Sequence, residues 1–400
     1  MSLDANRLST GKARHQFTGE VPVSGAWFEC DHPGERKFQN LGDLRLESGQ
    51  IIPSVRLAYE TWGTLSPNRD NVVLVLHALT GDSHVTGEAG PGHTSAGWWV
   101  DMVGPGAPID TDKYFVIAPN VLGGCQGSTG PASLHDDGAR YGSRFPRLTV
   151  RDQVTAEVRL LDFLGIGNIK LIIGASMGGH RVLEWAISQS ERVERIAVIA
   201  SAASTSADQL AWAHTQLAAI RLDPGFADGD YYDRPAGAGP HRGLGIARQI
   251  AHTTYRSAAE LDTRFARIPQ RAEEPLQGGR FAVQSYLDHQ ANKLVHRFDA
   301  NSYVILTESM LTHDVGRDRG GVAHALRKIT ARTLVIAVDS DRLFPLEQSQ
   351  EIVGAVRSAE PLHVLHSDHG HDGFLIEFDQ IGPVIDKFLS ARVLPELPEL

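Results

Sequence analysis

One serine in this chain stands in a sequence pattern that presents a nucleophile on a sharp turn. Residues 171–179 read LIIGASMGG, which places Ser176 between Gly174 and Gly178 at the end of an apolar run. The apolar residues that follow recur at helical spacing, so the pattern predicts a strand, a tight turn and a helix. The backbone at such a turn is crowded, and small residues two positions either side of the serine let the strand and the helix approach each other. The pattern therefore makes the Ser176 hydroxyl the first candidate to attack an acyl carbonyl.

A serine nucleophile needs a base that takes its proton and a carboxylate that orients this base. In chains with this kind of turn, the acid and then the histidine follow the serine along the sequence. Two candidate acids, Asp339 and Asp341, come after an apolar strand-like run, and the spacing does not choose between them. A histidine-rich stretch comes next, and its His371 precedes a segment compatible with a helix. Ser176, Asp341 and His371 thus fall in the expected order and on the expected kinds of loop.

The histidine-rich stretch also raises the alternative of a metal site. Its possible ligands are His363, His366, Asp368, His369, His371 and Asp372. Their spacing lacks the regular helical placement of the histidines in zinc hydrolases, and a serine nucleophile requires no metal. We therefore expect a catalytic histidine in this stretch and no bound metal.

Acyl transfer through a serine also requires hydrogen-bond donors for the negative charge that develops on the carbonyl oxygen. Two backbone N–H groups usually supply them, one from the residue after the nucleophile and one from the loop after an early strand. The first donor is then Met177. The second belongs to the loop at residues 77–81, which follows a strongly apolar strand, and we expect it to be Leu79.

Predicted strands and helices alternate along much of the chain, which indicates a mostly parallel sheet flanked by helices. The predicted strands are 44–46, 55–61, 72–76, 114–118, 171–173, 196–200, 333–337 and 362–365, and the predicted helices besides the one after the serine are 154–164, 208–222, 244–257, 281–297 and 381–389. We therefore expect an α/β-hydrolase fold whose core, residues 1–203 and 329–400, is interrupted by a helical lid at residues 204–328.

The composition is that of an ordinary protein that folds in water. The 400 residues are 42% hydrophobic and 22% charged, and the net charge of −10 argues against binding to nucleic acid or to an anionic membrane surface. The two cysteines, Cys30 and Cys125, form no C-x-x-C pair, so we expect neither a disulfide framework nor a cysteine-rich zinc site. No apolar run is long enough to cross a membrane, and residues 1–14 lack the apolar core of a signal peptide. We therefore expect a cytoplasmic protein.

Taken together, eight ordered segments make the chain similar to the homoserine O-acetyltransferase family, acyl-CoA-dependent enzymes of methionine biosynthesis with the α/β-hydrolase fold. The segments are YETWG (59–63), HALTGD (77–82), GWW (97–99), NVLGGC (120–125), GASMGG (174–179), HDVGR (313–317), SDRLFP (340–345) and GHDGFL (370–375). The similarity extends from about residue 44 to about residue 389. One departure is Ala175, where many members have glycine, and alanine is small enough to keep the turn.

The resemblance implies roles for individual residues. It makes Asp341 the acid, rather than Asp339, and His371 the base. The residues that it implies for binding homoserine are Arg248 at the carboxylate, Asp372 at the amine and Tyr255 in the wall of the pocket. From residue type alone, a surface ion pair would explain Arg248 and a helix cap would explain Asp372.

The activity implied is transfer of the acetyl group of acetyl-CoA to the hydroxyl of L-homoserine through an acyl-Ser176 intermediate, with acetyl-CoA as a co-substrate and no permanently bound cofactor. The alternatives are a succinyl-CoA donor, a serine acceptor or an esterase of the same fold. A binding protein without catalysis would require a broken triad, and none of the three residues is missing. The resemblance also implies a homodimer formed through the helical insertion.

Overall fold

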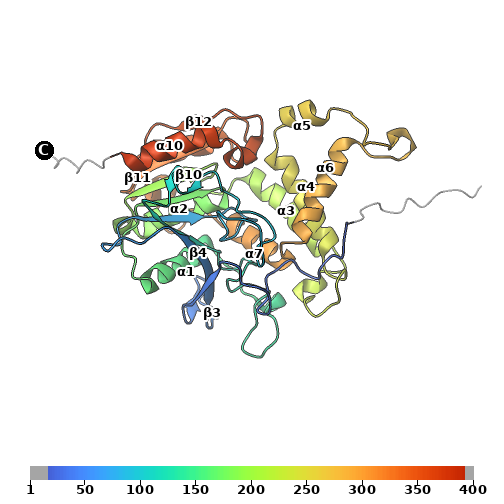
Figure 1. Cartoon of the computed structure of the whole chain (residues 1–400), viewed down its shortest axis with the longest axis horizontal. Helices are drawn as coiled ribbons and strands as arrows, with labels where there is room; N and C mark the ends of the chain where they lie inside the picture. Colours follow the sequence, from blue (N-terminus) through green and yellow to red (C-terminus); the bar gives the residue numbers. More distant parts are fainter. Residues whose placement is uncertain (1–16, 392–400) are drawn as a thin grey trace, which may run out of the picture.

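The computed structural model describes residues 17–391 of the chain (Figure 1). The polar segment at residues 1–14, where we expect no signal-peptide core, lies outside the described residues. Within residues 17–391, no helix has both the length and the apolar character needed to cross a membrane.

An eight-stranded sheet forms the centre of the larger part of the molecule. Its strands, in spatial order, are β1 (Lys37–Asn40), β4 (Arg56–Trp62), β8 (Phe115–Pro119), β5 (Val72–Leu76), β9 (Leu171–Ala175), β10 (Arg195–Ile199), β11 (Arg332–Val338) and β12 (His363–Leu365). The strands from β8 to β12 in this order are mutually parallel, whereas β4 is antiparallel to both of its neighbours. The expected, mostly parallel sheet is therefore confirmed. Its parallel strands end at one common edge, where such sheets build their sites.

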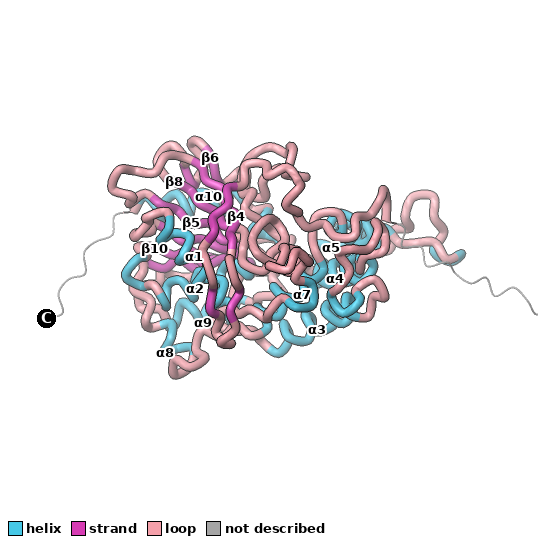
Figure 2. The backbone as a smooth tube through the Cα atoms, turned by 90° about the horizontal axis from the view of Figure 1, so that it is seen from below, coloured by secondary structure: helices cyan, strands magenta, loops and turns pink. Residues whose placement is uncertain are grey.

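Helices cover both faces of this sheet (Figure 2). One face packs on α1 (Val150–Phe163), α2 (Met177–Ser188), α8 (Val322–Leu326) and α9 (Leu346–Ala355), and the other on α10 (Phe378–Ser390). Neighbouring residues of β9 take part in different cores, since Ile172 packs with the first set of helices and Ile173 with α10. Because both faces are covered, the central strands read as continuous apolar runs in the sequence.

Between β10 and β11 the chain leaves the sheet and forms a helical region beside it (Figure 1). Its helices are α3 (Ala207–Arg221), α4 (His241–Tyr255), α5 (Ala258–Phe265), α6 (Ala282–Val295) and α7 (Ala300–Leu311). Apart from α5, they contribute to one hydrophobic core, in which α3, α4 and α6 place Leu217, Leu244 and Leu294. The same core includes Leu79 and Met177 from the part of the chain that carries the sheet. The N-terminal segment joins the same core through Val21 and Ala26.

Several elements have no counterpart among the predicted ones. They are β1, β3 (Ile51–Ile52), β6 (Val103–Gly104), β7 (Ile109–Asp110), α5, α7, α8 and α9. The strand expected at residues 44–46 forms as β2 (Leu44–Arg45), but it pairs with β3 in a small separate sheet. Helix α7 shows no polar face in its sequence, ANSYVILTESML, because nine of its residues are buried.

Candidate active site

Ser176 occupies the turn between β9 and α2 in a strained backbone conformation. Its φ is 54° and its ψ is −124°, a combination that L residues rarely adopt. A Cβ atom on Gly178 would overlap the carbonyl oxygen of Leu76, and one on Gly174 would lie 2.6 Å from the carbonyl carbon of Gly178. The turn therefore requires glycine at both positions, as the sequence pattern predicts, and places Ser176 at the carboxyl edge of the sheet.

Asp341, and not Asp339, lies against His371. The Oδ2 atom of Asp341 is 2.7 Å from Nδ1 of His371, and both side chains are buried. Its Oδ1 atom accepts two backbone N–H hydrogen bonds, of 2.8 and 2.9 Å, from the turn that follows it. Asp339 instead lies 2.9 Å from the exposed His366. The geometry thus distinguishes Asp341 from Asp339, which the spacing in the sequence could not do. The two backbone hydrogen bonds also fix the orientation of the Asp341 carboxylate.

Three aromatic rings surround the imidazole of His371. The ring centroids of Phe344, Phe374 and Tyr255 lie 5.1, 5.4 and 5.6 Å from that of His371. Burial acts to lower the pKa of His371, but the charge of Asp341 and its hydrogen bond outweigh burial, so the pKa lies above its ordinary value of 6.5. An imidazole whose protonated form is stabilised in this way is suited to accept a proton from a nucleophile.

Residues next to the Ser176 turn and residues in contact with His371 line the same small cavity. His180, one helical turn after Ser176, lies 5.8 Å from the ring of Phe344, and Phe344 stacks on His371. His180 and Phe344 line this cavity together with Leu79. Ser176 and His371 form no hydrogen bond with each other among the described residues. Catalytic hydrogen bonds often tighten only in the substrate complex, so this geometry is compatible with a nucleophile and its base.

A neutral histidine holds the loop after β5 in place. His77 accepts a hydrogen bond from the N–H of Val121 at Nε2, over 3.0 Å, so its proton lies on Nδ1 and is donated to the carbonyl oxygen of Ala78, over 2.8 Å. Burial, with the nearby charge of Arg181, lowers the pKa of His77 to about 3, which keeps the ring neutral. Both hydrogen bonds therefore persist across the physiological pH range and fix the loop that carries Leu79.

A buried ion pair ties the same loop to the helix that begins at the Ser176 turn. Arg181 donates to Glu157 from Nη1 over 2.5 Å and to the carbonyl oxygen of His77 from Nη2 over 2.5 Å. Trp185 donates to the second oxygen of Glu157 over 2.8 Å. The charged side chains of the pair are 0% and 1% exposed, so the interaction is shielded from water.

The two expected oxyanion donors lie on the elements fixed in this way. Met177 is the first residue of α2, so its N–H has no acceptor within the helix. The N–H of Leu79 forms no hydrogen bond with any other described residue. Both side chains are buried. Both backbone N–H groups are therefore free to donate a hydrogen bond to a ligand.

Arg248 and Tyr255, both from α4, lie beside this loop. Arg248 donates a long hydrogen bond of 3.4 Å from Nη1 to Oγ1 of Thr80, and its guanidinium lies 5.6 Å from the centroid of the Tyr255 ring. Its Nε atom is buried and has no hydrogen-bond partner within residues 17–391. Arg248 forms no ion pair there either. A surface ion pair therefore does not explain this residue, and its guanidinium is available to an anion.

Asp372, directly after His371, is already paired with a cation. Its Oδ2 atom lies 3.1 Å from Nε of Arg256, and Nη1 of the same arginine lies 3.2 Å from Oε1 of Glu260. Asp372 sits inside a short 3-10 helix (Gly370–Leu375) and caps no helix, so the capping explanation does not hold. Burial raises the pKa of Asp372 above its ordinary value, against the charges of Arg256, His371 and Arg248. No motif in the sequence marks Arg256, which the sequence analysis did not single out.

A different set of residues has the geometry of a metal site. Among the described residues, one group of three possible ligands has donor atoms within 4.8 Å of one another, namely Glu60, His84 and His93. Nδ1 of His84 lies 2.9 Å from Glu60, and Nε2 of His93 accepts a hydrogen bond of 3.1 Å from the N–H of Glu35. A metal ion would have to break both hydrogen bonds, so the set is better explained as a buried hydrogen-bonded network.

The strained serine turn, the acid–histidine pair and the sheet order are those of an α/β-hydrolase. The family model described as the alpha/beta hydrolase fold matches residues 71–377. Within that class, the chain is 58% identical over 377 residues to "Homoserine O-acetyltransferase" of Thermobifida fusca (strain YX), a match that covers 94% of this chain and 99% of the relative. The chain therefore belongs to the homoserine O-acetyltransferase family.

Solved structures with the same architecture include transferases and hydrolases. The homoserine O-acetyltransferase from Bacillus anthracis is 26% identical, with a TM-score of 0.82 over 90% of this chain and 98% of that one. Esterase E22 is also 26% identical, with a TM-score of 0.81 over 89% of this chain and 100% of that one. The same fold thus occurs in both transferases and hydrolases, so the acyl acceptor has to be inferred from the residues of the site.

Proposed function

We propose that this chain transfers the acetyl group of acetyl-CoA to the hydroxyl of L-homoserine by way of an acetyl ester on Ser176. The observation that carries the proposal is the His371–Asp341 pair, flanked by Arg248, a guanidinium without an ion-pair partner within residues 17–391, and by Asp372, a largely buried carboxylate. A zwitterionic amino acid requires one cationic and one anionic anchor, and a planar guanidinium suits a carboxylate. The family to which the chain belongs supports the same activity.

The first half of the reaction forms the acyl-enzyme. His371 takes the proton of the Ser176 hydroxyl, and the serine oxygen attacks the thioester carbonyl of acetyl-CoA. The backbone N–H groups of Leu79 and Met177 donate hydrogen bonds to the negatively charged oxygen of the tetrahedral intermediate. The carbon–sulfur bond then breaks, and the CoA sulfur leaves with the proton that His371 returns.

The second half transfers the acetyl group to the acceptor. Homoserine binds with its carboxylate at Arg248 and its amine at Asp372, beside the ring of Tyr255. His371 takes the proton of its side-chain hydroxyl, whose oxygen attacks the acetyl carbonyl. The bond to Ser176 breaks, His371 returns the proton to the serine oxygen, and O-acetylhomoserine leaves. This order is a ping-pong mechanism with one acyl-enzyme intermediate.

The helical region at residues 204–328 acts as a lid on a core made of residues 1–203 and 329–400. Helix α4 of this region supplies Arg248 and Tyr255, so the insertion forms one wall of the acceptor site. A covered site limits the access of water, which competes with homoserine for the acyl-enzyme.

The helical region also supplies the surface for a homodimer. It carries several exposed large apolar side chains, of which Leu222 is 82% and Leu276 is 97% exposed. Light scattering of the purified protein tests this part of the proposal. A cytoplasmic location agrees with the two free thiols, Cys30 and Cys125.

Release of CoA is the experiment that tests the activity. Acetyl-CoA and succinyl-CoA are supplied separately, each with L-homoserine, with L-serine or with no acceptor. Homoserine-dependent release from acetyl-CoA supports the proposal, and preference for succinyl-CoA or for serine would replace the donor or the acceptor. Release that ignores both acceptors would favour an esterase, the second candidate, which is kept because of the likeness to esterase E22.

A further inference from the structure

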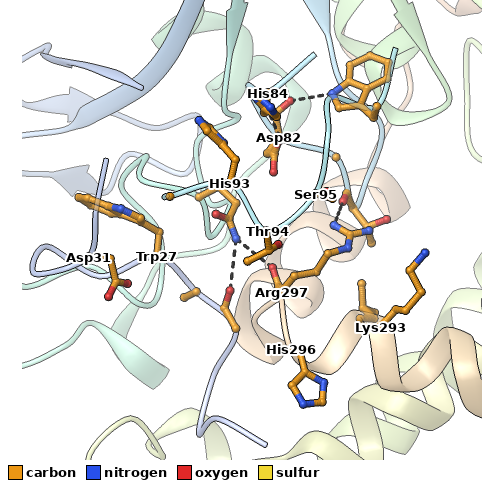
Figure 3. Close-up of a pocket in the computed structure, with 18 of the residues that line it drawn as sticks. Trp27, Asp31, Asp82, His84, His93, Thr94, Ser95, Lys293, His296 and Arg297 are labelled. Atoms are coloured by element: carbon orange, nitrogen blue, oxygen red, sulfur yellow. Dashed lines mark hydrogen bonds between the residues drawn. The ribbon is translucent and has the colours of Figure 1, made fainter. Parts of the chain in front are cut away.

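A cavity of about 810 Å³ lies beside the loop that carries the oxyanion donor (Figure 3). The N-terminal segment around Trp27, the loops on both sides of His84 and the end of α6 form its walls. It is lined by Thr80 and Arg248, and Thr80 is the residue after Leu79. The cavity therefore reaches the position proposed for the thioester, and its volume lies in the usual range for small-molecule sites.

Positively charged side chains outnumber negatively charged ones in the lining of this cavity, whereas the whole chain carries a net negative charge. Its lining includes the charged residues Arg36, Arg248, Lys293, Arg297, Asp31 and Asp82. Four cations thus face two carboxylates, in a chain whose net charge is −10. Both carboxylates already accept backbone hydrogen bonds, of 2.7 and 2.8 Å. The cavity is therefore suited to an anionic ligand.

Two of the four cations form no ion pair among the described residues and have no role in the proposed acceptor site. Arg36 donates to two carbonyl oxygens and to Gln126, which makes it part of the wall. Lys293 and Arg297, four residues apart at the end of α6, have no ion-pair partner within the part of the chain that the structure describes. Figure 3 shows both side chains at the same wall of the cavity. They provide two positive charges from one short segment.

Arg297 links this wall to the oxyanion loop. It donates a hydrogen bond of 2.8 Å from Nη1 to the carbonyl oxygen of Thr80. Burial lowers the pKa of Arg297, and the neighbouring charge of Arg248 acts in the same direction. A bound anion would offset both effects.

We infer that Lys293 and Arg297 bind the phosphate groups of the acyl donor, so that the thioester arm of acetyl-CoA passes Thr80 and Arg248 to reach Ser176. This inference rests on the proposed function. CoA carries a pyrophosphate and a further phosphate on its ribose, at the end remote from the sulfur. A guanidinium and an ammonium group are the side chains that recognise phosphate oxygens best, and a position beside the oxyanion loop lets this binding place the thioester.

Basic residues at the C-terminal end of a helix also have a purely structural explanation, because they offset the partial negative charge of the helix end. A structural role would affect every acyl donor equally. A phosphate-binding role would affect only donors that carry phosphates. The test therefore compares acetyl-CoA with S-acetylpantetheine, which has the same thioester arm and lacks the nucleotide.

The variant to compare is Lys293→Glu, with Lys328→Glu, an exposed lysine outside the cavity, as the matched control. At saturating homoserine, we expect the ratio of the KM for acetyl-CoA to the KM for S-acetylpantetheine to rise about 10-fold or more in Lys293→Glu and to stay constant in the control. Arg297→Gln should raise the same ratio. An unchanged ratio in both cavity variants would overturn the inference.

A binding measurement separates this inference from the proposed function. Adenosine 3′,5′-bisphosphate, the nucleotide end of CoA, is titrated calorimetrically into the full-length protein, so no acyl transfer is needed. Weaker binding to Lys293→Glu than to the unchanged protein supports the site even if acetyl transfer to homoserine is absent. Equal binding by the two proteins would overturn the site even if transfer to homoserine is observed.

Discussion

Nε of Arg256 lies 3.1 Å from Oδ2 of Asp372, so the carboxylate next to His371 is neutralised before any substrate amine reaches it. Arg256 follows directly on Tyr255 and lies 3.2 Å from Glu260, a second carboxylate. A shared arginine of this kind favours the ionised form of a largely buried carboxylate, because an opposite charge opposes the effect of burial on the pKa. In the proposed acceptor site, the homoserine amine joins this network as a further cation at Asp372.

We predict that Arg256→Gln weakens homoserine binding in a manner that depends on pH. Burial already raises the pKa of Asp372, and loss of the opposing charge of Arg256 raises it further. More of the carboxyl group is then protonated near neutral pH, so the KM for homoserine should rise about 10-fold or more and should fall again as the pH is increased. Asp372→Asn serves as the control, in which the KM is raised at every pH. An Arg256→Gln variant with an unchanged homoserine KM would contradict the role of the pair.

We predict that Asp341→Asn moves the acid limb of the pH profile. The pKa of His371 lies above its ordinary value because the charge and the hydrogen bond of Asp341 outweigh burial. In the unchanged protein, kcat/KM should therefore fall as the pH decreases through a value above 6.5. Removing the charge of Asp341 lowers that pKa, so the limb should shift to lower pH while kcat falls by several orders of magnitude. Asp339→Asn should leave the limb in place, and a shift in that variant instead would reassign the acid.

Loss of the buried ion pair should destabilise the whole fold. Glu157→Ala leaves Arg181 buried without a carboxylate, which costs about 3–5 kcal/mol of unfolding free energy in comparable cases. The change should appear as a lower midpoint in urea denaturation. Asp137→Ala, which removes one partner of an exposed ion pair with Arg144, should leave the midpoint nearly unchanged. Similar midpoints for both variants would show that the buried pair contributes little.

The Ser176 turn should not tolerate a methyl group at Gly178. A Cβ atom there would overlap the carbonyl oxygen of Leu76, so Gly178→Ala has to displace either α2 or β5. We expect a loss of about 1–3 kcal/mol or more in stability and a loss of CoA release. Gly354→Ala, in α9 with open space around it, is the matched control and should be neutral or stabilising. Full activity of Gly178→Ala would mean that the turn is less crowded than its geometry indicates.

The sequence predicted those parts of the fold where one physical signal dominates. The range predicted for β5, residues 72–76, agrees with the observed strand, because burial on both faces produces a continuous apolar run. Helix α1 begins at Val150, four residues before the predicted start, because Thr149 and Asp152 form a capping box that extends the helix beyond its apolar period. Helix α7 was not predicted, because an almost wholly buried helix has no polar face and hence no period.

The candidate site was predictable where its residues belong to local motifs. The motif around Ser176 contains both glycines that the crowded turn requires, whereas the choice of Asp341 needed either a family resemblance or coordinates. His77, Arg256 and Arg297 escaped the sequence analysis because their roles depend on partners far away in the chain, such as Val121, Asp372 and Thr80. Contacts between residues distant in the sequence form only when the chain folds, so they leave no pattern among neighbouring residues of the sequence.

Direct detection of the acyl-enzyme tests the central claim most directly. The protein is incubated with acetyl-CoA in the absence of homoserine and quenched with acid, and its peptides are analysed by mass spectrometry, with Ser176→Ala treated in parallel. We predict a single acetyl group on the peptide that contains Ser176, none in the variant, and its loss with formation of O-acetylhomoserine when homoserine is added before the quench. An unmodified Ser176 under conditions that release CoA, or an acetyl group that persists in the presence of homoserine, would contradict the mechanism.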